Sequence, residues 1–158
     1  MEKELTFLVI VDESPEMYKA LRYAALRSLR NDGRVALLYT FDKLEFSHWK
    51  AVEDIAEVES REKAELQIKD IESFLSKFTS KKPKKFIMKG DRIECITNFL
   101  KENKFISNLV LASTSEKSGS DPLINAFTGK FRSSLRVPLT IIPQNLSEEE
   151  IDKLSSIN

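Results

Sequence analysis

Continuous apolar runs alternate with amphipathic segments along the chain. Residues 6–11 and 34–40 are apolar at nearly every position, and shorter runs of this kind follow later. An unbroken apolar run is typical of a strand buried on both faces of a parallel sheet. Where apolar residues recur every three or four positions, they predict helices. The expected strands are 6–11, 34–40, 86–88, 109–111 and 138–142, and the expected helices are 15–30, 51–78, 91–103, a segment from 122, and 147–154.

Polar residues mark the expected helix starts. Ser14 and Asp121 are each followed by a proline, which is favoured at the first helical position. Ser147 and Glu150 have the spacing of a capping box. We therefore predict four side-chain N-caps, at Ser14, Asp91, Asp121 and Ser147. Inside the long 51–78 helix, the inner stripe is expected to comprise Val52, Ile55, Ala56, Ala64, Ile68, Ile71, Phe74, Leu75 and Phe78.

The order of these elements predicts the fold class. A strand, a helix and a second strand within residues 6–40 form a βαβ unit, which implies parallel strands and a right-handed crossover. Five strands alternating with helices predict an α/β fold with an open, doubly wound parallel sheet. The 158 residues fit one domain, 1–158, in which 144–158 would form a short C-terminal helical tail.

Composition narrows the classes of partner. Acidic and basic residues balance at 25 each, so no net field attracts nucleic acid or a membrane surface. No apolar run approaches the ~20 residues of a membrane span, and residues 1–4 lack the basic start of a signal peptide. The single cysteine, Cys95, excludes an internal disulfide, and its neighbours predict a buried, unreactive thiol. We therefore expect a cytoplasmic protein.

The segment from Leu109 to Pro122 has the form of a phosphate-binding strand–loop–helix. Its loop is rich in hydroxyl groups and has one lysine, Lys117, but only one glycine, Gly119. The following helix start favours anions, whereas Asp121 at that start opposes them, so the alternative to a phosphate site is a polar surface loop over the edge of the sheet. The hydroxyl groups belong to Ser113, Thr114, Ser115, Ser118 and Ser120.

Several segments together resemble the universal stress protein family, which is related to the adenine-nucleotide α-hydrolases. Residues 9–14 are similar to the family's first strand with its Asp and Ser, and residues 20–24 to its first helix. Residues 109–111 and 137–142 are similar to its fourth and last strands. The resemblance implies the strand order 3-2-1-4-5. It also implies a ligand site where strand order reverses, beside the first and fourth strands.

The ATP-binding members of that family carry Gly, two residues, Gly, nine residues, and then Gly-Ser or Gly-Thr. The corresponding positions here are Ala112, Ser115, Asn125 and Ala126, so every glycine is replaced. Glycine at such positions permits unusual φ values and close approach of the backbone to phosphate. Asn125 is moreover expected inside a helix, where its tolerance of left-handed backbone has no use.

The resemblance implies an adenine-nucleotide site for a ligand such as ATP or AMP. Asp12 would meet the adenine or ribose, although it is equally suited to accept hydrogen bonds from amides near the first helix. Tyr39 and Thr40 would line the adenine pocket, the alternative being core packing for the tyrosine. The candidate site residues are Val11, Asp12, Glu13, Ser14, Tyr39, Thr40, Ala112, Ser113, Thr114, Ser115, Lys117, Gly119, Asn125 and Ala126.

Catalysis is not expected from these residues. His48 is the only histidine, and no motif pairs it with a nucleophile, an acid or a metal-ligand set. Trp49 is interpreted as a lid over the strand ends, and the segment 46–49 resembles a bacterial branch of the family. The function implied is a non-catalytic stress-response homodimer that pairs through the edge strand 138–142. The alternatives are a nucleotide-free interaction scaffold and a weak ATPase.

Overall fold

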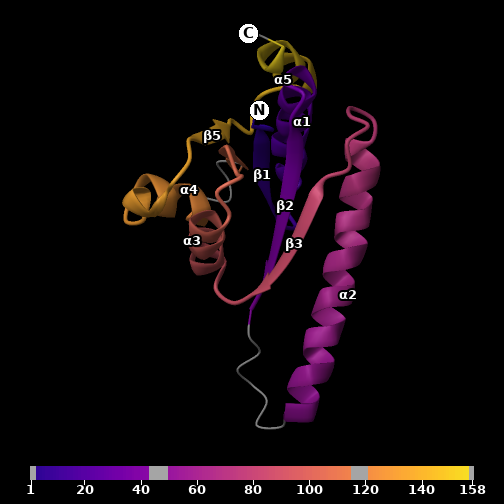
Figure 1. The fold of residues 1–158 in the computed structure, drawn as a ribbon, viewed down its shortest axis with the longest axis vertical. Coiled ribbons are helices and arrows are strands. Elements are labelled where there is room, and N and C mark those ends of the chain that lie inside the picture. The colour runs from indigo at the N-terminus through magenta and orange to yellow at the C-terminus, as the bar shows by residue number, and fades with distance from the viewer. Residues whose placement is uncertain (1–2, 43–49, 115–120, 157–158) are drawn as a thin grey trace.

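The computed structural model describes residues 3–42, 50–114 and 121–156. Its centre is a five-stranded sheet in the order β3-β2-β1-β4-β5, and every neighbouring pair is parallel (Figure 1). The predicted fold class and strand order are therefore confirmed. The strands are β1 (Thr6–Val11), β2 (Arg34–Phe41), β3 (Lys84–Lys89), β4 (Asn108–Ala112) and β5 (Leu139–Ile142).

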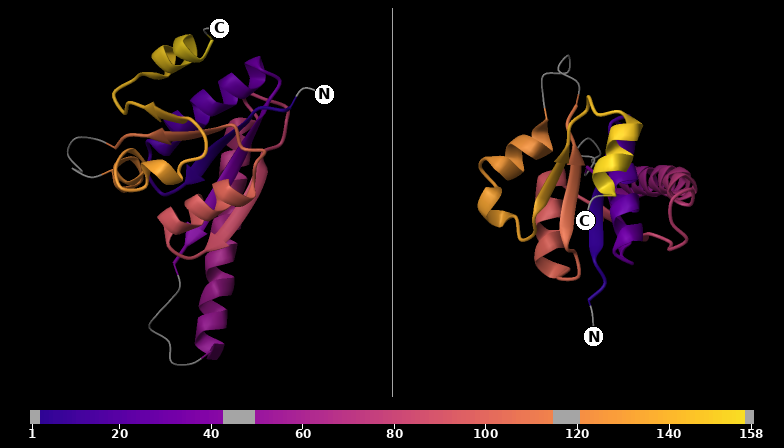
Figure 2. Two further views of the ribbon diagram at one scale, coloured as in Figure 1. Left: turned by 60° about the vertical axis from the view of Figure 1, so that its left-hand side comes forward. Right: turned by 90° about the horizontal axis from the view of Figure 1, so that it is seen from above.

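Helices cover both faces of the sheet. Helices α1 and α2 pack on one face and α3 and α4 on the other, while α5 lies against α1 (Figure 2). The helices are α1 (Met17–Arg30), α2 (Lys50–Leu75), α3 (Arg92–Glu102), α4 (Pro122–Thr128) and α5 (Glu148–Ser155), with a short 3₁₀ turn η2 (Arg132–Ser134). Within these described residues, no helix has the length and apolar character that crossing a membrane requires.

The core explains the unbroken apolar strands. All six residues of β1 are buried, because β1 lies between β2 and β4 and beneath helices on both faces. Val9 and Val11 pack toward α1 and α2, whereas Leu8 and Ile10 pack toward α3 and α4. Apolar side chains are needed on both faces of such a strand, which produces the pattern seen in the sequence.

Two of the four predicted N-caps are confirmed and two are wrong. Asp91 accepts a hydrogen bond from the amide of Glu94 at 3.1 Å, and Ser147 forms the capping box with Glu150. Ser14 does not cap α1, which begins at Met17, because its hydroxyl donates to the Asp12 carboxylate instead. Asp121 precedes Pro122 as expected, yet its side chain makes no capping bond to α4.

The inner stripe predicted for α2 is correct only in the second half of the helix. Ala64, Ile68, Ile71 and Leu75 are buried, whereas Val52 and Ile55 are 56% and 61% exposed. The first turns of α2 extend past the ends of β2 and β3, so no sheet lies beneath them (Figure 1). Cys95 is buried on α3, as predicted.

Candidate functional site

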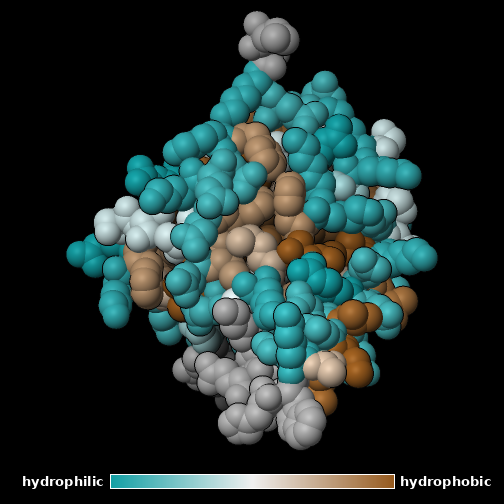
Figure 3. Space-filling model, turned by 60° about the horizontal axis from the view of Figure 1, so that its bottom comes forward, coloured by the Kyte–Doolittle hydropathy of each residue, from teal (hydrophilic) through white to brown (hydrophobic). Residues whose placement is uncertain are grey.

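A cavity of about 490 Å³ lies at the carboxyl ends of the strands, where the strand order reverses between β1 and β4. Asp12 reaches it from the end of β1, Thr40 from β2, and Thr114 from the segment after β4. The first residues of α3 and α4 close its sides. Figure 3 turns this end of the molecule forward and shows apolar surface surrounded by polar side chains.

Asp12 organises the turn between β1 and α1. Its Oδ1 atom accepts hydrogen bonds from the Ser14 amide at 2.8 Å and from the Ser14 hydroxyl at 2.6 Å. Its own carbonyl oxygen accepts a hydrogen bond from the side-chain amide of Gln67 on α2. The expected role of Asp12 as an acceptor for a nearby backbone amide is therefore observed. Asp12 is also one of the residues that line the cavity.

The two polar residues after β4 have different roles. Ser113 continues the pairing with β5, since its amide donates to the Ile142 carbonyl at 2.9 Å and its hydroxyl accepts from the Gln144 amide at 2.9 Å. Thr114 lines the cavity, and its amide donates to Asp121 Oδ1 at 2.7 Å. The Asp121 carboxylate thus binds the end of the preceding strand segment rather than the first turn of α4.

The opposite wall of the cavity carries a guanidinium group. Arg92, the first residue of α3, donates from Nε to the Thr40 hydroxyl at 3.2 Å and is half-buried. It also contributes to a lowered pKa of Glu13, although the main cause is the Lys63 ammonium, which lies 2.7 Å from that carboxylate. Arg92 therefore reaches from the start of α3 to the end of β2, where it lines the cavity.

The structure brings five of the predicted site residues into the cavity lining. These are Asp12, Ser14, Thr40, Ala112 and Thr114. The others that are described lie elsewhere: Val11 and Tyr39 pack in the core, Glu13 and Asn125 are exposed, Ala126 is buried, and Ser113 bonds toward β5. Ser115, Lys117 and Gly119 lie outside the described residues, as do His48 and Trp49.

Sequence reasoning missed Arg92 and Asp42 as lining residues, and assigned Asp91 only a capping role. All three follow a strand at its carboxyl end. The rule that pointed to Asp12 would have found them if it had been applied to the ends of β2 and β3 as well. In the described part of the chain, no group of three or more His, Cys, Asp or Glu side chains is arranged to hold a metal ion.

Solved structures share this fold along nearly the whole chain. Universal stress protein UspA from Lactobacillus plantarum has a TM-score of 0.67 at 20% identity, covering 90% of this chain and 99% of that chain. A universal stress protein family member from Burkholderia pseudomallei gives 0.66 at 16% identity, covering 90% and 98%. A universal stress protein in complex with cAMP gives 0.62 at 9% identity, covering 91% and 100%. At these identities the likeness shows the fold alone.

Family membership is shown by the sequence rather than by the structural likeness. No curated protein matches the chain. The profile of the universal stress protein family, however, matches residues 5–143, which extend from just before β1 to just after β5. Since this match covers most of the chain and the whole sheet, the chain belongs to the universal stress protein family.

Proposed function

We propose that this protein is a stress-response module that binds an adenine nucleotide, without hydrolysing it, in the cavity between β1 and β4. The observation that carries the proposal is the cavity itself. Its volume of about 490 Å³ and its place at the reversal of strand order are typical of small-molecule sites in α/β proteins. A protein of the same fold has been solved in complex with cAMP, which further supports a nucleotide ligand.

The proposal includes binding without catalysis. Phosphoryl transfer needs cations placed around the transferred group and a residue that orients the nucleophile. Among the described residues of the cavity wall, Arg92 is the sole cation, and none belongs to a metal-binding cluster. Asp12, which is the natural candidate for a base, already holds the Ser14 amide and hydroxyl.

The proposed assembly is a homodimer that pairs along β5. This strand is at the edge of the sheet, and no strand of the described residues lies beside its outer backbone groups. Ile141 is 38% exposed on it. We expect Ile141→Lys to give a monomer by light scattering, whereas Leu154→Lys, which changes an exposed leucine on α5, should leave the dimer intact. A monomeric wild-type protein at tens of micromolar would contradict the dimer.

A second candidate function is a nucleotide-free interaction scaffold. The replacement of the family's glycines by Ala112, Ser115, Asn125 and Ala126 favours it, because backbone approach to phosphate is then restricted. Asn125 is exposed on α4 and does not line the cavity. A nucleotide, if bound, must therefore be held by other residues than those of the family's glycine motif.

Calorimetric titration with adenosine, AMP, ADP and ATP distinguishes the two candidates, after extraction to detect nucleotide that co-purifies. We expect binding, and we expect Ala112→Leu to abolish it by filling the cavity while the melting temperature stays close to that of the wild type. Asn125→Leu is the matched control, since it adds the same side chain outside the cavity. If none of the four ligands gives a heat of binding and no nucleotide co-purifies, the nucleotide-free interaction scaffold is the remaining candidate function.

A further inference from the structure

The cavity has more carboxylates than a polyphosphate site would tolerate. Among its described lining residues, Asp12, Asp42, Asp91 and Asp121 are acidic, and Arg92 is the one basic residue. The described part of the cavity wall therefore has an excess of acidic over basic residues.

Arg92 nevertheless offers a prepared contact for one anionic group. Its Nε–H is held by the Thr40 hydroxyl, which fixes the plane of the guanidinium group. No described residue accepts a hydrogen bond from its two terminal amino groups, and no described ion pair includes it. Such a fork of N–H donors matches the oxygen atoms of a single phosphate group in two parallel hydrogen bonds.

We propose that the ligand class is a nucleotide with one phosphate group, that Arg92 holds this phosphate, and that the four carboxylates discriminate against di- and triphosphates. The inference rests on the nucleotide site proposed above. Each further phosphate adds negative charge that faces carboxylates across a partly enclosed space, where the repulsion is stronger than in water. The carboxylate oxygens are acceptors, which suits them to ribose hydroxyls and to an exocyclic amino group.

The first arm of the test measures dissociation constants for adenosine, AMP, ADP and ATP, without magnesium and at low ionic strength. We expect AMP to bind most tightly and ATP to bind at least about tenfold more weakly than AMP. Added salt should reduce that difference, because it screens the repulsion. ATP binding as tight as AMP under these conditions would overturn the inference but leave the proposed nucleotide site intact.

The second arm uses Arg92→Gln and Arg92→Lys. We expect Arg92→Gln to weaken the binding of AMP about tenfold, to the affinity found for adenosine. The affinity for adenosine should not change. Arg92→Lys should restore part of the loss, since it returns the charge without the fork of donors. Arg136→Gln removes the same charge from an exposed position outside the cavity and serves as the control. Thermal denaturation confirms that each variant is folded.

Two results would overturn the assignment of Arg92. An equal loss of adenosine and AMP in Arg92→Gln would show that Arg92 supports the cavity wall rather than a phosphate. Unchanged AMP binding in that variant would show that the phosphate lies elsewhere. If none of the four ligands binds the wild-type protein, the proposed function fails, and the inference fails with it.

Discussion

The carboxylate of Asp121 accepts a hydrogen bond from the amide of Thr114 at 2.7 Å, although seven positions separate the two residues. The bond joins the start of α4 to the chain that leaves β4. Asp121 therefore ties the start of α4 to the end of the β4 segment, and it is also one of the acidic residues that line the cavity.

Replacing Asp121 separates these two effects. Asp121→Ala removes the acceptor and should lower the free energy of unfolding by about 1–2 kcal/mol, because the Thr114 amide loses a charged partner. Asp121→Asn keeps an acceptor oxygen, so urea denaturation should show a smaller loss. The asparagine variant should also bind ATP more tightly than the wild type, with adenosine little changed. A larger loss in the free energy of unfolding for Asp121→Asn than for Asp121→Ala would contradict the role of Asp121 as acceptor for the Thr114 amide.

The ion pair between Arg22 on α1 and Asp152 on α5 should make stability depend on acid pH. The guanidinium group donates to both carboxylate oxygens, at 2.6 and 2.9 Å, and this hydrogen bonding lowers the pKa of Asp152 below its ordinary value of 3.8. A lowered folded-state pKa means that the contribution is complete above the ordinary value and is lost as the pH falls below it.

Asp152→Asn should therefore reduce stability at pH 7 by at most about 1 kcal/mol, because the pair is partly exposed to solvent. The difference between variant and wild type in the free energy of unfolding should shrink as the pH falls below 3.8. Urea denaturation of both proteins at pH 7, 4 and 2 measures this difference in the free energy of unfolding. Lys63→Met, which breaks the fully exposed pair with Glu13, is the control and should have little effect at any of these pH values.

Two isoleucines of α2 offer a matched test of where this helix meets the core. Ile71 is fully buried and Ile55 is 61% exposed. Ile71→Ala should lower the free energy of unfolding by about 2–5 kcal/mol, because apolar burial is lost and a cavity remains. The free energy of unfolding of Ile55→Ala should stay within about 0.5 kcal/mol of that of the wild type. Chemical denaturation measures the free energy of unfolding of both variants. Equal losses would show that the exposed turns of α2 pack against something in solution.

Cys95 should react slowly with thiol reagents in the folded protein. Burial raises the pKa of its thiol, and nearby Asp91, Glu94 and Asp42 add to the shift, so less thiolate is present at a given pH. Labelling at pH 8 should be more than about tenfold slower in the native protein than in urea. Rapid labelling of the native protein, at the rate found in urea, would contradict a buried thiol.

The helix caps show what the sequence could and could not predict. Asp91 and Ser147 cap as expected, and each accepts its hydrogen bond from an amide of its own helix. Ser14 and Asp121 have neighbours that compete for them, the Asp12 carboxylate in one case and the Thr114 amide in the other. Residue type near a helix start predicts an acceptor, but the partner depends on which chain segment the fold places beside it.

The candidate site was predictable in position rather than in detail. The rule that ligands lie beyond the carboxyl ends of strands placed Asp12, Thr40 and Thr114 at one cavity. The family's glycine positions led to Asn125 and Ala126 instead, which lie outside it. Arg92 could have been found by extending the same rule to β3, but its contact with Thr40 depends on the register between β2 and β3.

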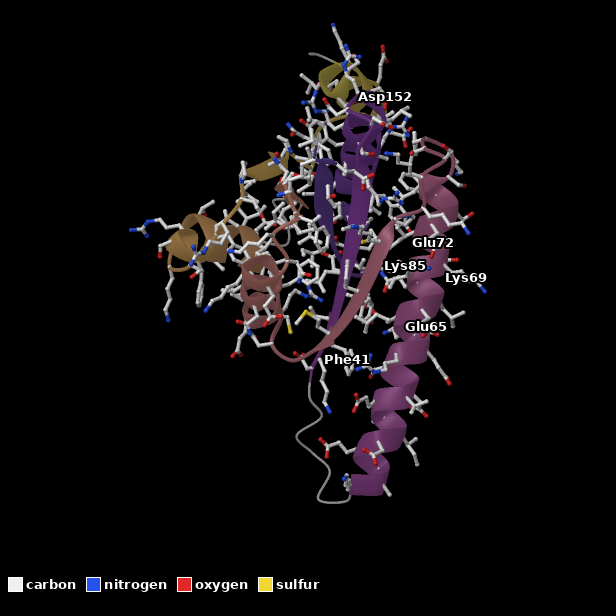
Figure 4. The ribbon with its side chains drawn as sticks, in the orientation of Figure 1. Phe41, Glu65, Lys69, Glu72, Lys85 and Asp152 are labelled. Carbon is white, nitrogen blue, oxygen red and sulfur yellow. The ribbon has the colours of Figure 1, made fainter. Side chains whose placement is uncertain are left out.

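Helix α2 is held by the sheet along only part of its length. Lys85 on β3 contacts Glu72 at 2.6 Å (Figure 4). Lys89 contacts Glu57 at 3.0 Å, while none of residues 50–56 is buried. Unequal support of this kind lets one end of a helix open without the rest. Amide protons of the first two turns should therefore exchange with solvent through local fraying, and those around Ile71 only when the whole molecule unfolds.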